Sequence, residues 1–312
     1  MTSAIAILTY QRQDVLKKTL DTLVKTIPAM VPVAIFDDFS LRDNTVEWLR
    51  SQPDLTEGGN RELCDTIEAD SFTIMYEGRR VEVFSGRQNL GVAANSNRAL
   101  KWFETSTIGY DHLLLANDDL IFNGNVVAAY AQAHTDLEIG LFCFNNLKDD
   151  QHRWMTTSYR GYKLKVFQMM TGAAMSMTKG LINTIGYFDP AFGKFGEEHC
   201  DYTNRARIRG FMKVTGVNQV CIDVDFKPQV LDHQHDAASS VTPMEKEACD
   251  AIATQTMRDK LNSYGQGQVY VPFKLRHIRF VSGHAGFGAG IRPQNMPGYT
   301  EARFIPPSPV DE

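Results

Sequence analysis

The chain has 312 residues, of which 43% are hydrophobic and 22% are charged, and its formal net charge is -5. This composition excludes a disordered chain, and the negative charge argues against a general attraction to nucleic acid or anionic lipid. Five cysteines without a CxxC pair indicate neither a disulfide framework nor a zinc site. No apolar run approaches the roughly 18 residues of a membrane span, and the N-terminus lacks a signal peptide, so a cytoplasmic protein is expected.

Apolar runs typical of strands alternate with helical stretches along the first half of the chain. This alternation is typical of a parallel sheet flanked by helices. In chain order the predicted elements are a strand at 3–10, a helix at 14–26, a strand at 31–38, a helix at 44–51, a strand at 81–86, a helix at 92–104, a strand at 110–117, a helix near 126–134 and a strand at 139–145.

Two stretches depart from this alternation. Residues 53–80 contain Gly58, Gly59 and many charges, and are predicted to be an insertion between sheet strands. From about residue 262 onward the chain is rich in glycine and proline, which predicts an irregular arm. We therefore expect one domain at 1–240 and a C-terminal helix with an irregular extension at 241–312, through which a homo-oligomer could form.

Polar side chains follow three of the predicted strands, at 9–12, 37–38 and 117–119. Ligands of open parallel sheets bind beyond the carboxyl ends of the strands, so these groups are expected to converge. On an extended strand Asn117 and Asp119 would face the same way, and Asp118 would turn aside or bend the chain. Such hard oxygens suit Mg²⁺ or Mn²⁺ bound together with phosphates, whereas the alternative is an ordinary polar turn.

Six blocks of the sequence stand out in chain order: AILTYQRQDVLKKTLDTLV, FDDFSLRDNT, QNLGVAANSNRAL, LLLANDDL, TGAAMSMTKGLINTIGYFDPAFG and EHCDYTNRARIRGF. Their order and spacing resemble those of family 2 nucleotide-sugar glycosyltransferases, and the resemblance covers about residues 3–240. It implies a single Rossmann-like α/β domain of the A-type glycosyltransferase fold with a mostly parallel central sheet.

The resemblance implies a set of positions that bind the nucleotide sugar. A carboxylate at the end of the second strand can accept the uracil N3 hydrogen, which favours UDP without excluding dTDP. Helix capping by the two aspartates or by Asn89, and tight strand packing at Gly172, are structural alternatives. The positions are Thr9, Tyr10, Arg12, Asp37, Asp38, Asn89, Gly91, Asn97, Arg98, Asn117, Asp118, Gly172 and Ala173.

The family's metal motif, often written DXD, falls on residues 117–119, with asparagine in its first position. Asp119 is therefore expected to be the main protein ligand of Mn²⁺ or Mg²⁺. In related enzymes a histidine after the last core strand is a second ligand, and both His233 and His235 are candidates. His235 is slightly favoured by its spacing to Ser239.

The family's catalytic base lies in an ED motif that opens a helix, and the matching residues are Glu198 and His199, followed by Asp201 and Arg205. Histidine replaces the usual aspartate, and since histidine can take up a proton near neutral pH, His199 is the predicted base. Glu198 or Glu197 could serve instead. Asp201 and Arg205 could be merely an intrahelical pair, and without a base the protein would be retaining or inactive.

The resemblance thus implies a metal-dependent hexosyl- or pentosyltransferase, inverting if it has a base, with a glycan or glycan precursor as acceptor. A hydroxymethylated DNA base is a less favoured acceptor, suggested by Lys274, Arg276, His277 and Arg279 in the C-terminal arm. A noncatalytic sugar-binding protein of the same fold is the alternative of another class. A nucleotidyltransferase would need a glycine-rich first loop, which TYQRQD lacks.

Overall fold

The structure, a computed structural model, describes residues 1–62, 68–145, 153–167, 170, 172–214, 221–237, 239–265, 269–270 and 304–305. The basic residues of the predicted C-terminal arm, Lys274, Arg276, His277 and Arg279, lie outside these ranges. Within the ranges, no helix is both long and apolar enough to cross a membrane.

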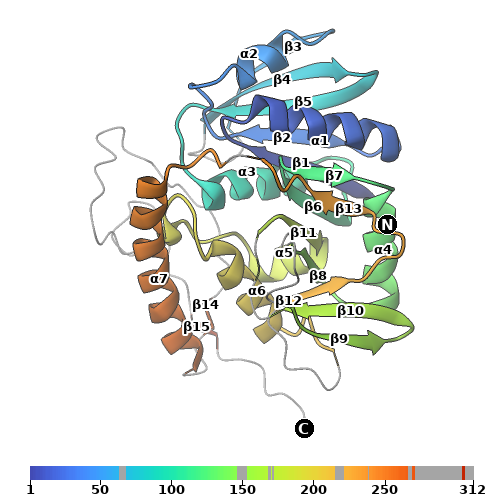
Figure 1. Cartoon of the computed structure of the whole chain (residues 1–312), viewed down its shortest axis with the longest axis vertical. Helices are drawn as coiled ribbons and strands as arrows, with labels where there is room; N and C mark the ends of the chain where they lie inside the picture. The colour runs from blue at the N-terminus through green and yellow to red at the C-terminus, as the bar shows by residue number, and fades with distance from the viewer. Residues whose placement is uncertain are drawn as a thin grey trace.

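An eight-stranded sheet forms the centre of the molecule, in the order β3-β4-β5-β2-β1-β6-β11-β8 (Figure 1). The inner strands β5, β2, β1 and β6 run parallel, whereas β11 is antiparallel to both β6 and β8. The predicted α/β fold with a mostly parallel central sheet is therefore confirmed. The strands are β1 (Ser3–Thr9), β2 (Val33–Asp37), β3 (Thr56–Glu62), β4 (Glu68–Tyr76), β5 (Arg79–Gly86), β6 (His112–Asn117), β8 (Leu141–Phe144) and β11 (Ala174–Thr178).

Helices connect the strands, and apolar spacing explains why they pack on the sheet. In α1 (Gln13–Thr26), Leu16, Leu20 and Leu23 follow one face of a 3.6-residue period and all three are buried. The other helices are α2 (Thr45–Arg50), α3 (Val92–Thr105), α4 (Val126–Leu137), α5 (Lys179–Ile185), the 3-10 helix η1 (Pro190–Phe192), α6 (Glu198–Ile208) and α7 (Pro243–Gly265).

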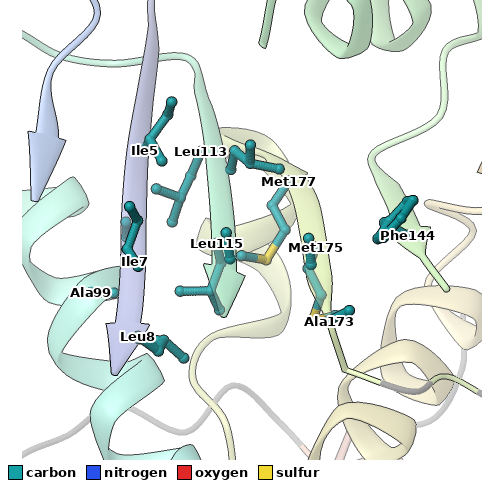
Figure 2. Packing of buried hydrophobic residues seen from close by; sticks show 14 of the residues in the cluster. Ile5, Ile7, Leu8, Ala99, Leu113, Leu115, Phe144, Ala173, Met175 and Met177 are labelled. Carbon is teal, nitrogen blue, oxygen red and sulfur yellow. The ribbon is translucent and has the colours of Figure 1, made fainter. Parts of the chain in front are cut away.

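The core fixes where the strands end. In the parallel pairing of β1 with β6, Ile5 lies opposite Leu114 and Ile7 lies opposite Ala116, and all four residues are buried. Strand β11 follows on the other side of β6 and adds buried residues such as Met175 and Met177 (Figure 2). Because a slip of one residue would turn every side chain to the opposite face, this buried packing specifies the register. Leu8 therefore pairs with Asn117, and the polar residues that follow both strands emerge at the same edge of the sheet.

The predicted insertion at 53–80 holds β3 and β4, which extend the sheet beyond β5 as antiparallel strands. Within the described residues β3 is the edge strand, where polar residues and glycines are tolerated, and β4 lies between β3 and β5.

Three smaller sheets complete the fold. One contains β9 (Arg153–Tyr159), β10 (Tyr162–Phe167) and β12 (Cys221–Val224); another pairs β14 (Val269–Tyr270) with β15 (Phe304–Ile305). The third pairs β7 (Leu120–Phe122) with β13 (Leu231–His233). Helix α7, drawn in orange, stands beside the sheet (Figure 1), and its residues Glu245 and Cys249 line the same pocket as Leu8 and Thr9 of β1.

Candidate active site

Strand β6 ends at Asn117, whose N–H donates a 2.9 Å hydrogen bond to the carbonyl of Ala173. Asp118 and Asp119 form a turn before β7, so the alternation of an extended strand stops one residue earlier than predicted. As a result Asp118 does not turn aside. Both carboxylates point to the guanidinium group of Arg12, from the loop after β1.

One nitrogen of Arg12 binds both acids: Nη2 lies 2.9 Å from Asp118 Oδ1 and 2.6 Å from Asp119 Oδ2. The hydroxyl of Thr9 donates a 2.6 Å hydrogen bond to the other oxygen of Asp118. Only 16% of the Arg12 side chain is exposed, so water screens these contacts little. The loop after β1 is thus tied to the acidic turn after β6.

The pKa values of Asp118 and Asp119 are shifted in opposite directions. Burial raises the pKa of Asp118 to about 7, because it outweighs the effects of Arg12 and the Thr9 hydrogen bond. Burial also acts to raise the pKa of Asp119, but the hydrogen bond from His233 and the charge of Arg12 prevail and lower it to about 2. Asp119 is therefore the acid that stays ionised at neutral pH.

The pairing of β13 with β7 places His233 opposite Leu120, next to Asp119. His233 Nε2 lies 3.2 Å from Asp119 Oδ2, whereas His235 Nε2 is 3.9 Å from Asp232 and does not contact Asp119. Of the two candidate histidines, His233 is therefore the one beside the acid, although the sequence slightly favoured His235.

The residues around Asp119 fit a divalent cation. Two ligands that hold Mg²⁺ at about 2.1 Å and at right angles lie roughly 3 Å apart, close to the separation of His233 and Asp119. Asp119 Oδ1 is buried and has no hydrogen-bond partner in the described structure. No three His, Cys, Asp or Glu side chains of the described ranges form a metal cluster by themselves, so donor phosphates or water would complete the coordination.

The acids that follow β2 are already hydrogen-bonded. Asp37 accepts from the Ser40 hydroxyl at 2.5 Å and from the Ser85 hydroxyl at 3.1 Å, and it does not line the pocket described below. Asp38 accepts the N–H group of Gly91 at 2.7 Å and pairs with Arg98 at 3.2 Å. Burial raises the pKa of both acids against these contacts. Neither caps α2, which follows Asn44.

Gly91 precedes α3 and permits a close approach of two backbone segments. Its φ is +88°, and a Cβ there would lie 2.3 Å from Lys194 Cα. The next residue, Val92, donates its N–H to the Lys194 carbonyl at 2.6 Å. Asn89 is not the helix cap, since Gly91 occupies that position. The side-chain oxygen of Asn89 is buried and accepts no hydrogen bond within the described residues.

Asn97 and Arg98 lie inside the protein. The carboxamide of Asn97 bonds both backbone groups of Phe188, at 2.9 and 2.8 Å. Arg98 is fully buried and contacts Asp38 and, at 3.1 Å, the side chain of Asn95. Neither residue lines the pocket described below, and both bond neighbouring protein groups instead.

A cavity of about 150 Å³ lies at the carboxyl ends of β1 and β6. Eight residues predicted to bind the nucleotide sugar line it: Thr9, Tyr10, Arg12, Asp38, Asn89, Gly91, Asn117 and Asp118. The sequence analysis missed other lining residues, among them Lys194, Phe195, Ser240, Val241, Glu245 and Cys249. Lys194 and Phe195 fall between two of the motif blocks, whereas the residues of the α7 region carry no motif.

The predicted catalytic residues open α6. His199 Nδ1 lies 2.7 Å from Glu198 Oε1, and both side chains are buried. Gly172, with a φ of +78°, packs on this ring, and a Cβ there would lie 2.9 Å from His199 Nδ1. The adjacent residue, Ala173, is buried, and its carbonyl accepts the hydrogen bond from the Asn117 N–H. Residues 172 and 173 therefore lie between His199 and the turn after β6.

Asp201 faces away from this pair. It is fully buried, with one oxygen 2.9 Å from Arg205 Nε and the other 3.3 Å from Lys260 Nζ of α7. Lys260 also lies 2.7 Å from Asp189. Burial acts to lower the pKa of Lys260, but Asp201 and Asp189 outweigh it and raise the pKa. The intrahelical pair of Asp201 and Arg205 is thus present. It belongs to a buried network of charged residues that joins α7 to α6 through Lys260.

A pocket at the carboxyl ends of parallel strands, with a glycine before a helix and paired acids after a buried strand, is the arrangement of α/β proteins that bind a ligand at the edge of an open parallel sheet. The sequence model described as "Glycosyl transferase family 2" matches residues 4–192. The chain belongs to this glycosyltransferase family, as its motifs predicted. No curated protein matches the sequence significantly.

Solved structures similar to the chain include a mannosyltransferase, PcManGT from Pyrobaculum calidifontis, in complex with GDP-Man and Mn²⁺ (13% identity over 83% of this chain, TM-score 0.49). Others are S. aureus TarS 1-349 in complex with UDP (14% over 67%, TM-score 0.45) and GalNAc-T7 with UDP, GalNAc and Mn²⁺ (13% over 75%, TM-score 0.49). The chain spans 64%, 55% and 44% of these three structures, respectively.

Proposed function

We propose that the protein is a glycosyltransferase that moves a hexose or pentose from a nucleoside-diphosphate sugar, with UDP favoured, to an acceptor hydroxyl. The observation that carries this proposal is the meeting of Arg12, Asp118, Asp119 and His233 beside a pocket at the ends of parallel strands. A diphosphate requires positive charge, which a guanidinium group and a cation held by carboxylate and imidazole can supply. Membership of glycosyl transferase family 2 supports the same reaction class.

Asp119 and His233 would hold Mn²⁺ or Mg²⁺, with the remaining ligands from the donor and water. A cation bound there neutralises charge on the departing diphosphate. Arg12 already binds the carboxylate oxygens of the turn, and its planar guanidinium is equally suited to phosphate oxygens. In the absence of a donor Arg12 and a cation would therefore compete for Asp119.

We propose that Asn89 is the residue that recognises the nucleobase of the donor. A uracil N3 hydrogen needs an acceptor, and the carboxamide oxygen of Asn89, which has no hydrogen-bond partner among the described residues, could provide one at the pocket. The carboxylate of Asp37, expected to fill this role, is already occupied by Ser40 and Ser85. This assignment keeps UDP as the favoured carrier, with GDP and dTDP as the comparisons.

The transfer is proposed to be an inverting displacement. The acceptor oxygen forms a bond to the anomeric carbon as the bond to the diphosphate oxygen breaks, and the electron pair leaves with the diphosphate. The acceptor's proton passes to His199, the base at the start of α6. The proposed acceptor is a glycan or glycan precursor; the basic residues that suggested a hydroxymethylated DNA base lie outside the described structure.

A thermal-shift screen of UDP, GDP and dTDP with and without Mn²⁺ tests donor binding. UDP with Mn²⁺ should raise the melting temperature most, and Asp119→Ala should remove the part of the shift that depends on Mn²⁺. Asp259→Ala, which changes an exposed acid on α7, is the control. A chain that none of the nucleotides stabilises would refute the proposed function, and an unchanged Mn²⁺ effect in Asp119→Ala would refute the metal site.

Mass spectrometry of nucleotide-sugar hydrolysis then identifies the donor sugar, and acceptor pools that contain glycans and hydroxymethylated DNA separate the two acceptor classes. A protein that binds the donor firmly but neither hydrolyses nor transfers the sugar would be the noncatalytic alternative.

A further inference from the structure

Glu198 and His199 are adjacent in sequence, yet their side chains meet in the interior. His199 Nδ1 lies 2.7 Å from Glu198 Oε1, and the side chains are only 11% and 4% exposed. A contact of this length between a ring nitrogen and a carboxylate is a hydrogen bond in which Nδ1 carries the hydrogen. The neutral ring therefore has its lone pair on Nε2.

The surroundings of the ring favour this orientation. Gly172 packs against Nδ1, where a Cβ would come within 2.9 Å, so a larger residue would push the ring off its present position. Phe188 meets the ring edge-on, with 5.5 Å between the ring centroids. Within the described residues, no hydrogen bond reaches Nε2, which leaves this atom available for a substrate.

Glu198 has an unusual environment for a carboxylate. It is 3% exposed, and its second oxygen, Oε2, is buried with no hydrogen-bond partner among the residues described. A buried negative charge with half of its hydrogen-bonding capacity unmet is unfavourable, and it becomes less so when the neighbouring group turns cationic. A cationic ring 2.7 Å away would therefore be a favourable neighbour for the Glu198 carboxylate.

We propose that Glu198 is a positioning residue that fixes the Nδ1–H tautomer of His199 and stabilises the imidazolium formed when Nε2 takes the acceptor's proton. The pair would replace the single aspartate expected at this place, by the same division of labour that a carboxylate and a histidine have in hydrolytic triads. This inference rests on the proposed sugar transfer, and its test contains one arm that does not depend on activity.

That arm is nuclear magnetic resonance of the protein labelled with ¹⁵N-histidine, at about pH 8 where histidine is largely neutral. The His199 signals are identified by their loss in His199→Gln. The unmodified protein should show the Nδ1–H tautomer, and Glu198→Gln should move the ring toward Nε2–H, because an amide can donate to Nδ1. An Nε2–H ring in the unmodified protein would overturn the proposal, even if the variant failed to fold.

The kinetic arm compares turnover with donor KM. Glu198→Gln should lower kcat by about tenfold or more, within the roughly 10²–10⁴-fold that a general base contributes, and leave the donor KM within about twofold. Glu247→Gln, an exposed glutamate on α7, is the matched control and should match the unmodified protein. A Glu198→Gln protein with full kcat would refute the proposed role of Glu198 in positioning His199.

Failure of the proposed function would look different. If His199→Gln kept full transfer, or if no donor and acceptor gave transfer at all, the role of His199 as base would be refuted whatever its tautomer. His199→Asp should recover part of the turnover that His199→Gln loses, because it restores a carboxylate at the base position.

Discussion

Arg12 is the residue whose removal should reveal most about the acidic turn. We consider Arg12→Met, which keeps the length of the side chain and removes its charge. Only 16% of the Arg12 side chain is exposed, and its guanidinium group contacts two carboxylates at 2.9 and 2.6 Å. Loss of one partner from a buried ion pair costs about 3–5 kcal/mol, because the remaining charge is left without compensation.

The expected result without ligands is a free energy of unfolding lower by about 3–5 kcal/mol, or a melting temperature lower by roughly 5–8 °C for a chain of this size. Mn²⁺ should reverse much of this loss, because a cation can bind the carboxylates that Arg12 has released. Ligand binding to the native state adds RT ln(1 + [L]/Kd), so a tighter Kd for Mn²⁺ appears directly as a larger shift.

The assay is differential scanning fluorimetry with Mn²⁺ alone and with Mn²⁺ plus UDP, supported by calorimetric titration of Mn²⁺. Arg12→Met should gain more from Mn²⁺ alone than the unmodified protein does, and less from added UDP, because the phosphates lose the guanidinium. Arg42→Met is the control, since Arg42 is 63% exposed and lies 4.0 Å from Glu245. Equal or weaker Mn²⁺ binding in Arg12→Met would refute competition between Arg12 and the cation.

Three further changes test other parts of the structure. Gly91→Ala should lower the free energy of unfolding by at least about 1–3 kcal/mol and weaken nucleotide binding, because its Cβ would collide with the Lys194 backbone. Chemical denaturation and nucleotide titration measure the two effects, and unaltered values would contradict the close approach of the two segments. Lys260→Met should destabilise the protein by about 3–5 kcal/mol by leaving Asp201 without its second cation, and a loss below about 1 kcal/mol would show that α7 is held otherwise. Burial lowers the pKa of His134 from 6.5 to about 4, so the unfolded chain binds the proton first as the pH falls. Between pH 6.5 and about pH 4, His134 should therefore lower the free energy of unfolding by about 1.4 kcal/mol for each pH unit of acidification. His134→Asn should flatten that slope in urea titrations.

Much of the sheet could be predicted because its evidence is local. Strands β1, β2 and β6 are short apolar runs that end in polar residues, and their parallel order follows from the helices between them. The same local evidence placed Thr9, Asp38 and Asp118 at one edge. It could not place β3 and β4, whose polar composition suits an outer edge of the sheet as well as a loop.

The contacts between distant parts of the chain could not be predicted from the sequence. His233 rather than His235 meets Asp119 because β13, a strand of three residues, pairs in a particular register with β7. A shift by two residues would bring His235 to the place of His233, and nothing in LDHQHD sets that register. Likewise Glu245 and Cys249 reach the pocket through the packing of α7, for which the sequence carries no local signal.

A motif also cannot separate a residue that meets the ligand from one that supports it, because both are polar and lie near the site. The structure offers a physical distinction in the hydrogen bonds that each group has already formed. Both oxygens of Asp37 are taken by protein groups, whereas one buried oxygen each of Asn89, Asp119 and Glu198 has no partner within the described ranges. An oxygen buried in this way is costly unless something binds it. In the proposed function these three atoms would meet the nucleobase, the cation and the proton-transferring ring, so substitutions there should change ligand binding or turnover more than substitutions at Asp37.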